Sequence, residues 1–122
     1  MIAQYTAASM VSQNKQLCNP ASADSIESSN GQEDHVSMGA NAATKLLKVV
    51  DNVYGILGVE LLNAVQALWL RGEEIQGPLG QLYQAFITES PAIEEDIYLH
   101  ERMELAKNFL KNRELKELAL LL

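Results

Sequence analysis

The stretch 46-LLKVVDNVYGILGVELLNAVQALWL-70 decides the fold of this 122-residue chain. When it is read with the 3.6-residue period of an α-helix, large apolar side chains fall on nearly every side. Glu60 is the only charged residue in its second half. Gly55 and Gly58 lower helix propensity by up to about 1 kcal/mol each relative to alanine, so we expect another helix to contact them closely. The pattern predicts one long, buried helix over residues 38–71.

A helix that is apolar on all sides is either buried among other helices or spans a membrane. A membrane span needs about 20 residues with few polar groups, and here Glu60, Asn63 and Gln66 interrupt the segment on one side. We therefore expect no membrane partner. The apolar surface of this helix, together with Leu118–Leu122 at the end of the sequence, exceeds what three shorter helices can cover. Because large exposed apolar patches mark interfaces, we expect the chain to self-associate.

Shorter helices are predicted on both sides of the long one. Residues 1–17 carry small apolar residues at helical spacing, which suits close packing, and we expect the long helix to pack lengthwise against them. Residues 79–122 hold two further helical patterns. The first follows a linker in which Gly77-Pro78 acts as a breaker, and the second opens at Glu94-Glu95-Asp96. Because no strand alternation is present, we predict a single all-α domain over the whole chain, built as an elongated helical bundle.

Composition is typical of a soluble globular protein, with 48% hydrophobic and 20% charged residues. The net charge is −7 and no basic cluster occurs, so nucleic acid and anionic membrane surfaces are poor partners. Cys18 is the only cysteine, which excludes an internal disulfide and favours a reducing compartment. We expect it to be a small buried apolar residue. No charged segment followed by a long apolar core comes after Met1, so we expect no signal peptide and a cytoplasmic protein.

A polar loop over residues 18–37 separates the first two predicted helices. Loops of this length inside compact domains are uncommon, and they tend to be functional or disordered. Asn30-Gly31, a pair that readily adopts left-handed backbone angles, precedes Gln32-Glu33-Asp34-His35-Val36-Ser37-Met38. Ser37 is the expected N-cap of the long helix. Neighbouring ionisable side chains at the mouth of a buried helix are costly unless they are paired or used, so this stretch is the candidate functional site.

The same stretch carries a family resemblance. Gln-Glu-Asp-His-Val-Ser-Met-Gly at residues 32–39, after Pro-Ala-Ser-Ala-Asp-Ser at 20–25, resembles the C-terminal half of the histidine ammonia-lyases, within the aromatic amino acid lyase superfamily. The resemblance begins at Met-Ile-Ala-Gln-Tyr-Thr-Ala-Ala, residues 1–8, and runs to roughly residue 100. It implies that the helical bundle is the C-terminal part of the lyase fold, and that the chain matches only a piece of the family enzyme.

By this resemblance, Glu33 matches the family's active-site glutamate, which contacts the substrate. A carboxylate can accept a hydrogen bond from an imidazole and stabilise its charged form. The resemblance puts Gln32 beside it in substrate binding. Asp34, His35 and Ser37 are expected to orient the loop. From residue type alone, Glu33 would be interpreted as a solvated loop carboxylate. The motif favours the active-site role instead.

Two other kinds of site find little support. A metal site needs three or more converging ligands, and His100, the only other histidine, lies far along the chain from His35. We therefore expect no bound metal. Ser22 and Ser25 have no histidine or aspartate at a spacing that indicates a catalytic triad, so nucleophilic catalysis is unsupported.

The family's electrophile is a methylidene-imidazolone group formed by cyclisation of an internal Ala-Ser-Gly, and no Ala-Ser-Gly occurs among the 122 residues. The resemblance also implies that the catalytic tyrosine lies in an N-terminal portion. Our first hypothesis is therefore a piece of a carbon–nitrogen lyase that converts L-histidine to urocanate and ammonia, needs a complementary N-terminal portion, and is inactive alone. One alternative is a non-catalytic remnant that serves as a helical oligomerisation module. Another is a lyase or aminomutase relative that acts on a different aromatic amino acid.

Overall fold

The computed structural model describes residues 2–23, 25–32 and 35–112. Within these ranges the regular elements are helical, so the predicted all-α fold is confirmed. The elements are α1 (Ile2–Leu17), the short 3₁₀ helices η1 (Ala21–Ala23) and η2 (Ser29–Gly31), α2 (Gly39–Arg71), α3 (Gly77–Glu89) and α4 (Leu99–Lys111). The surface that we expected from Leu118–Leu122 lies outside the described residues.

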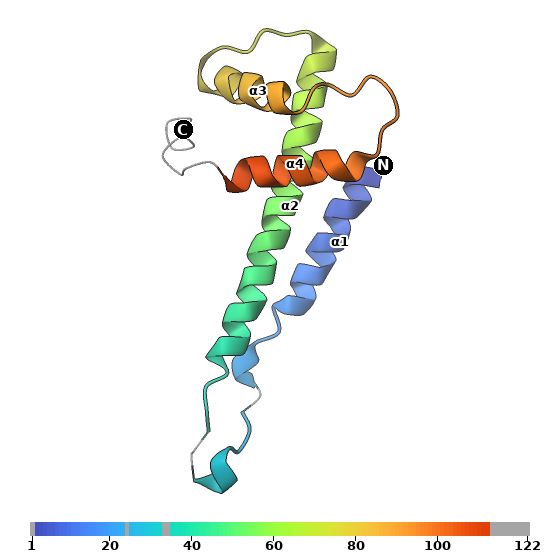
Figure 1. Cartoon of the computed structure of the whole chain (residues 1–122). Helices are drawn as coiled ribbons and strands as arrows, with labels where there is room; N and C mark the ends of the chain where they lie inside the picture. Colours follow the sequence, from blue (N-terminus) through green and yellow to red (C-terminus); the bar gives the residue numbers. More distant parts are fainter. Residues whose placement is uncertain (1, 24, 33–34, 113–122) are drawn as a thin grey trace.

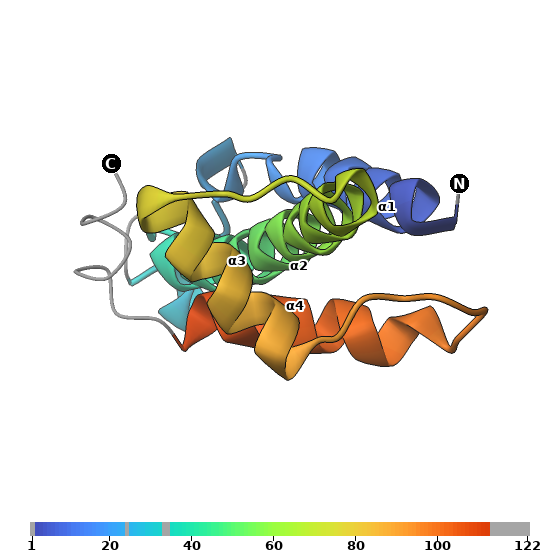
Figure 2. The ribbon, with the colours of Figure 1, turned by 90° about the horizontal axis from the view of Figure 1, so that it is seen from above.

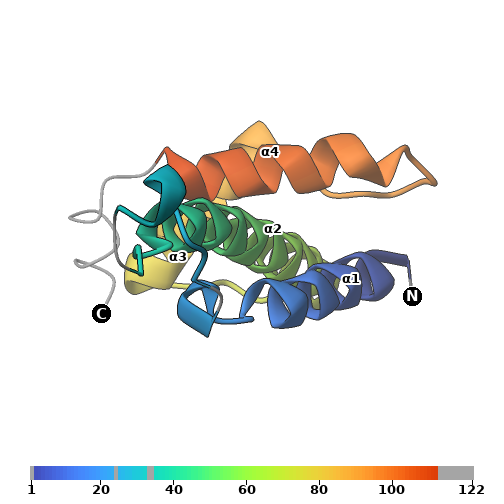
Figure 3. The ribbon, with the colours of Figure 1, turned by 90° about the horizontal axis from the view of Figure 1, so that it is seen from below.

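Helix α2 is the axis of the molecule. It runs unbroken through 33 residues, a length of about 50 Å at the rise of an α-helix. Helix α1 runs antiparallel beside it, and α4 crosses it (Figure 1). Seen from above and from below, α1 and α4 lie on opposite sides of α2 (Figure 2, Figure 3). The prediction of a continuous helix packed lengthwise against the N-terminal helix is therefore confirmed.

Helix α1 contacts the rest of the chain through one face. Its half-buried side chains recur at helical spacing: Ala3, Thr6, Ala7, Met10, Asn14 and Leu17. No residue of α1 is buried, because α2 covers it on one side only. A Cβ added to Gly55 would lie 2.7 Å from the sulfur of Met10. The missing side chain at Gly55 therefore lets α1 and α2 approach closely.

The hydrophobic core lies where α2, α3 and α4 meet. The rings of Phe86 and Phe109 pack edge to face with their centroids 5.1 Å apart, and Phe86 is fully buried. A Cβ added to Gly58 would lie 2.8 Å from the backbone nitrogen of Lys107, so α2 and α4 cross closely at this glycine. The buried cluster consists of Leu62, Val65, Phe86, Ala106 and Phe109.

By length and composition alone, α2 is apolar enough to cross a membrane, since an 18-residue window of it has a mean hydropathy of 1.5. Two of its polar side chains, Asp51 and Gln66, are instead paired with other parts of the chain. Asp51 forms ion pairs with Lys107 and Lys111 on α4. Gln66 donates to the carbonyl of Ile93 at 3.1 Å and accepts from the amide of the same residue at 2.8 Å. These pairings are those of a core helix in a bundle.

The predicted burial of α2 is reached only between Gly55 and Val65, and Leu70 at its C-terminal end is exposed. Its buried residues are Gly55, Gly58, Val59, Leu62 and Val65. Toward the N-terminal end, large apolar side chains remain exposed, and Leu47 keeps 71% of its surface accessible. Coverage explains the difference, because α1 and η1 pack along the N-terminal part of α2, whereas α4 crosses the buried part (Figure 1).

Two predicted helix starts are wrong. The N-cap of α2 is Met38 rather than Ser37, and the Met38 side chain makes no capping hydrogen bond. The helix still closes its first turn, since the amide of Ala42 donates to the Met38 carbonyl at 3.1 Å. Helix α4 begins at Leu99, so residues 94–96 lie in the connection from α3. Acidic side chains favour a helix start electrostatically, but they do not supply the apolar face that begins with Leu99.

Two further expectations are corrected. Gly77 and Pro78 open α3 instead of breaking the chain before it, with the proline in the first turn. A helix does not need an amide hydrogen from that turn, so the missing N–H of proline costs nothing there. Cys18 is exposed rather than buried, because it stands where α1 has ended and the polar loop begins.

Candidate functional site

The loop that carries the candidate site joins α1 to α2 and projects beyond the ends of both helices, away from α3 and α4 (Figure 1). Its first residues are held in place. The amide of Cys18 donates to the carbonyl of Asn14 at 3.1 Å. The ammonium of Lys45 on α2 donates to the carbonyl of Asn19 at 2.8 Å. The loop therefore leaves the helices at a defined point.

The turn η2 is left-handed. Ser29, Asn30 and Gly31 have φ angles of 53°, 57° and 75°, as the Asn-Gly pair predicts. A Cβ on Gly31 would meet the carboxylate of Glu27, the end of a flexible side chain that can move aside, so it is the positive φ that favours glycine there. The amide of Gln32 donates to the carbonyl of Ser29 at 3.1 Å. This bond sets the direction in which the 32–39 motif begins.

A side-chain contact connects the two sides of the loop. The hydroxyl oxygen of Ser25 lies 3.1 Å from Nδ1 of His35 and 3.3 Å from the carbonyl oxygen of Val36, to which it donates. Ser25 and His35 are both exposed, and Val36 is half-buried. A contact of this kind suits a loop-orienting histidine, and the orienting role of His35 stays a prediction.

The structure describes the predicted site residues only in part. Gln32 has an exposed side chain directly after the turn, and Ser37 is exposed just before α2. Glu33 and Asp34 lie outside the described residues, so their catalytic, binding and orienting roles stay predictions. The pairing of Ser25 with His35 escaped sequence reasoning. Its signal was the Asn-Gly turn midway between them, which indicates a hairpin in which the two residues can face each other.

The described part of the chain holds no cluster of side chains that could bind a metal ion. Within residues 2–23, 25–32 and 35–112, no three His, Cys, Asp or Glu side chains converge on one point. His100 lies on α4, where its ring is 5.9 Å from that of Tyr98. Ser25 lies within hydrogen-bonding distance of the carbonyl oxygen of Val36 and of Nδ1 of His35.

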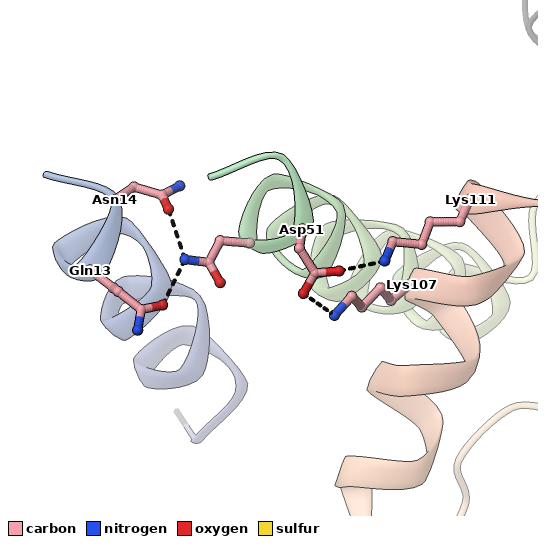
Figure 4. Close-up of polar contacts among 6 residues, drawn as sticks. Gln13, Asn14, Asp51, Lys107 and Lys111 are labelled. Atoms are coloured by element: carbon pink, nitrogen blue, oxygen red, sulfur yellow. Dashed lines mark hydrogen bonds and ion pairs between the residues drawn. The ribbon is translucent and has the colours of Figure 1, made fainter. Parts of the chain in front are cut away.

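Two polar contacts hold α2 to its neighbours between the loop and the core (Figure 4). On one side, Asp51 accepts from Lys107 at 2.7 Å and from Lys111. These hydrogen bonds from the two ammonium groups lower the pKa of the Asp51 carboxyl below its ordinary value. On the other side, the amide nitrogen of Asn52 donates to the side-chain oxygens of Gln13 at 2.7 Å and Asn14 at 2.8 Å.

An open groove of about 390 Å³ adjoins these contacts. It is lined by Gln13, Leu47, Lys48, Asp51 and Asn52, from α1 and α2. Three of its polar lining residues, Gln13, Asp51 and Asn52, already bond to one another or to α4. The groove therefore belongs to the helix contacts and does not extend the candidate site.

Comparison with known proteins gives a consistent answer. Residues 1–90 match the family described as aromatic amino acid lyase. The chain is 41% identical over 118 residues to the histidine ammonia-lyase of Macrococcus caseolyticus, covering 96% of this chain and 24% of that protein. It is 44% identical over 115 residues to the histidine ammonia-lyase of Treponema denticola, covering 93% of this chain and 23% of that protein.

A solved structure agrees. The crystal structure of histidine ammonia-lyase from Trypanosoma cruzi superposes with a TM-score of 0.89 at 40% sequence identity, over 99% of this chain and 24% of that one. The four helices and the loop between α1 and α2 therefore follow the path of one segment of a much longer protein. The chain spans about a quarter of the length of the relatives it matches.

Proposed function

The chain belongs to the aromatic amino acid lyase family, a family of carbon–nitrogen lyases, and we propose that it supplies the C-terminal part of a histidine ammonia-lyase. The reaction is the non-oxidative elimination of ammonia from L-histidine to give urocanate. The observation that carries this proposal is the Gln-Glu-Asp-His-Val-Ser-Met-Gly motif at residues 32–39. The motif begins in the loop between α1 and α2, and the chain superposes on a segment of a histidine ammonia-lyase.

Within this proposal, Glu33 contacts the substrate. Its carboxylate accepts a hydrogen bond from the imidazole of histidine and stabilises the charge that this ring gains in the transition state. Gln32, directly before it, helps to bind the same substrate. The exposed position of Gln32 after the η2 turn and the projection of the loop beyond the helices (Figure 1) support a site that is open to a partner.

The rest of the active site comes from a complementary N-terminal lyase portion. The methylidene-imidazolone electrophile cannot form from this chain, because no Ala-Ser-Gly occurs in it. We infer that the isolated chain is inactive. We also infer that the assembled protein is an oligomer in the cytoplasm. Support comes from the share of the relatives that the chain covers, about a quarter.

A second candidate is a non-catalytic helical module that only self-associates. It is favoured by the apolar side chains left exposed on α1 and α2, among them Ile2 at 76%, Leu46 at 61% and Leu47 at 71%. Apolar surface of this kind marks interfaces. The two candidates differ in whether the loop takes part in chemistry, and activity measurements separate them.

The test is co-expression of this chain with the N-terminal three quarters of the Treponema denticola enzyme, followed by the ultraviolet absorbance of urocanate. The chain alone should release no urocanate from histidine, and the pair should. Glu33→Gln keeps shape and hydrogen bonding but removes the charge. It should lower kcat/KM by about a hundredfold or more, a barrier change of at least ~2.7 kcal/mol.

Glu27→Gln, which alters another carboxylate of the same loop, is the matched control and should stay within about twofold of the unmodified pair. Unchanged activity in Glu33→Gln would remove the assignment of that residue. Turnover by the isolated chain would overturn the claim that it is a partial enzyme. An assembled but inactive pair would favour the oligomerisation module.

A further inference from the structure

We propose that Ser25 and His35 form a positioning pair that holds the 32–39 motif in place, with the Nδ1–H of His35 donating to Ser25 and the Ser25 hydroxyl donating to the carbonyl of Val36. Neither residue touches substrate in this account. The pair acts on Glu33 through the backbone of the loop. Its effect on activity rests on the proposed function, whereas the pairing itself is a property of this chain alone.

The hydrogen count selects the tautomer. A serine hydroxyl has one hydrogen to donate and two lone pairs with which to accept. The carbonyl oxygen of Val36 can only accept, and it lies 3.3 Å from the Ser25 oxygen, so the hydroxyl hydrogen goes there. The second contact, 3.1 Å to Nδ1 of His35, then needs its hydrogen from the ring. His35 is therefore protonated on Nδ1, and its Nε2 is free to accept when the ring is neutral.

The pair connects the 32–39 motif to the opposite side of the loop. Ser25 and His35 are ten residues apart on the two sides of the loop, and the η2 turn lies between them. The motif is held at two points: Gln32 donates to the turn through its amide, and Ser25 bonds to both His35 and the next carbonyl. Only residues 33 and 34 separate these two points along the chain. In this proposal the pair therefore fixes the chain at His35 and Val36, on the C-terminal side of Glu33.

The pairing is tested first by nitrogen-15 NMR of the histidine rings in the full chain. Two-bond couplings between ring protons and ring nitrogens identify the protonated nitrogen. At a pH where the ring is neutral, His35 should be protonated on Nδ1, whereas a free imidazole favours Nε2–H, and His100 serves as the reference in the same spectrum. Ser25→Ala should move His35 toward the Nε2–H form, and Ser25→Thr should restore the Nδ1–H form. Ser12→Ala, an exposed serine of α1, should change nothing.

The positioning role is tested in the co-expressed pair of lyase portions. Ser25→Ala should lower kcat about tenfold with less than about a twofold change in KM, because the interaction that it disturbs is made in the transition state. Ser25→Thr should recover most of the loss. Loss of stability alone would lower the amount of active protein without this recovery, so enzyme concentration is set by titration of active sites.

Each outcome bears on one claim. If His35 is protonated on Nε2 in the unmodified chain, or if Ser25→Ala leaves its tautomer unchanged, the pair is refuted. If the tautomer behaves as expected but Ser25→Ala keeps both kcat and KM, the positioning role is refuted. If the unmodified lyase pair makes no urocanate, the proposed function fails, and the NMR result still decides whether Ser25 and His35 are paired.

Discussion

The two ends of α2 lie in different surroundings. From residue 58 onward, α2 meets α3 and α4, and this crossing region contains the buried cluster around Phe86 and Phe109. Residues 39–57 of α2, with α1 and the loop between them, form an arm that lacks a second layer of helices (Figure 1). Apolar side chains such as Leu47 stay exposed there. The buried contacts that stabilise the chain therefore lie where α3 and α4 meet α2, whereas the candidate functional site lies on the loop before the N-terminal end of α2.

The largest expected difference between the two regions is in the cost of removing an aromatic ring. Phe86 is 0% exposed in the crossing region, and Tyr5 is 65% exposed on the arm. Phe86→Ala leaves a cavity in the core and should lower the free energy of unfolding by about 3–5 kcal/mol. Tyr5→Ala should stay within about 0.5 kcal/mol, as surface substitutions do. Urea unfolding followed by circular dichroism measures both, and equal losses would erase the distinction between the regions.

The two glycines of α2 sharpen the same comparison. A Cβ at Gly58 would meet the backbone of Lys107, at 2.8 Å from its nitrogen, whereas a Cβ at Gly55 would meet the sulfur of Met10 at 2.7 Å. The backbone of α4 cannot move aside, so Gly58→Ala should cost about 1–3 kcal/mol through overpacking. The thioether of Met10 can rotate away, and alanine favours a helix by up to about 1 kcal/mol over glycine.

Gly55→Ala should therefore be neutral or slightly stabilising in the same urea measurement. A Gly58→Ala chain as stable as the unmodified one would mean that α2 and α4 do not cross where the structure has them. A costly Gly55→Ala would instead mean that the arm is packed as rigidly as the crossing region.

A smaller effect is expected at the border between the regions, where Asp51 bonds to Lys107 and Lys111. The side chain of Asp51 is 47% exposed, so solvent weakens both pairs, and Asp51→Asn should cost about 1 kcal/mol at neutral pH and low salt. The two ammonium groups lower the pKa of Asp51 in the folded chain. The stabilisation is therefore complete above the pKa of the unfolded chain, about 3.9, and is lost as the pH falls through the lower folded-state value.

The stability difference between Asp51→Asn and the unmodified chain should accordingly shrink as the pH is lowered below about 4. Thermal unfolding across pH 2 to 7 measures it, with Glu60→Gln, an exposed carboxylate of the same helix, as the matched control. A difference that stays constant over this range, or one equal to that of the control, would contradict the ion-pair assignment.

The sequence predicted the crossing region and the arm unequally well. Helix periodicity from Leu46 to Leu70 was enough to place α2, because one signal repeated over many turns outweighs local exceptions. The starts of α2 and α4 were missed, since capping by Ser37 and the charges of residues 94–96 are single-residue signals that neighbouring contacts override. The sequence indicated that part of the apolar surface of α2 would stay uncovered, but not that this part would lie around Leu47, because an apolar residue carries no sign of whether its partner is in the same chain.

The candidate site was predictable in a different way. The Asn-Gly turn follows from local chemistry, since Gly31 has a positive φ that glycine adopts without strain. The contact of Ser25 with His35 depends on how the two sides of the loop align, which residue types alone do not determine. The role of Glu33 comes from the motif and not from any local rule, and it stays a prediction until activity is measured.

The most direct test of the account is amide hydrogen exchange of this chain with and without the complementary N-terminal lyase portion. We propose that the N-terminal portion covers the exposed apolar side chains of the arm, whereas the core of the crossing region is already buried in the isolated chain. Backbone amides of α1, the loop and residues 39–57 should gain protection from exchange on assembly. In the isolated chain these segments make few buried contacts, so they open locally at a low cost in free energy. Amides of α3 and α4 around Phe86 and Phe109 should change little. Protection gained only in α3 and α4, or nowhere, would contradict the account.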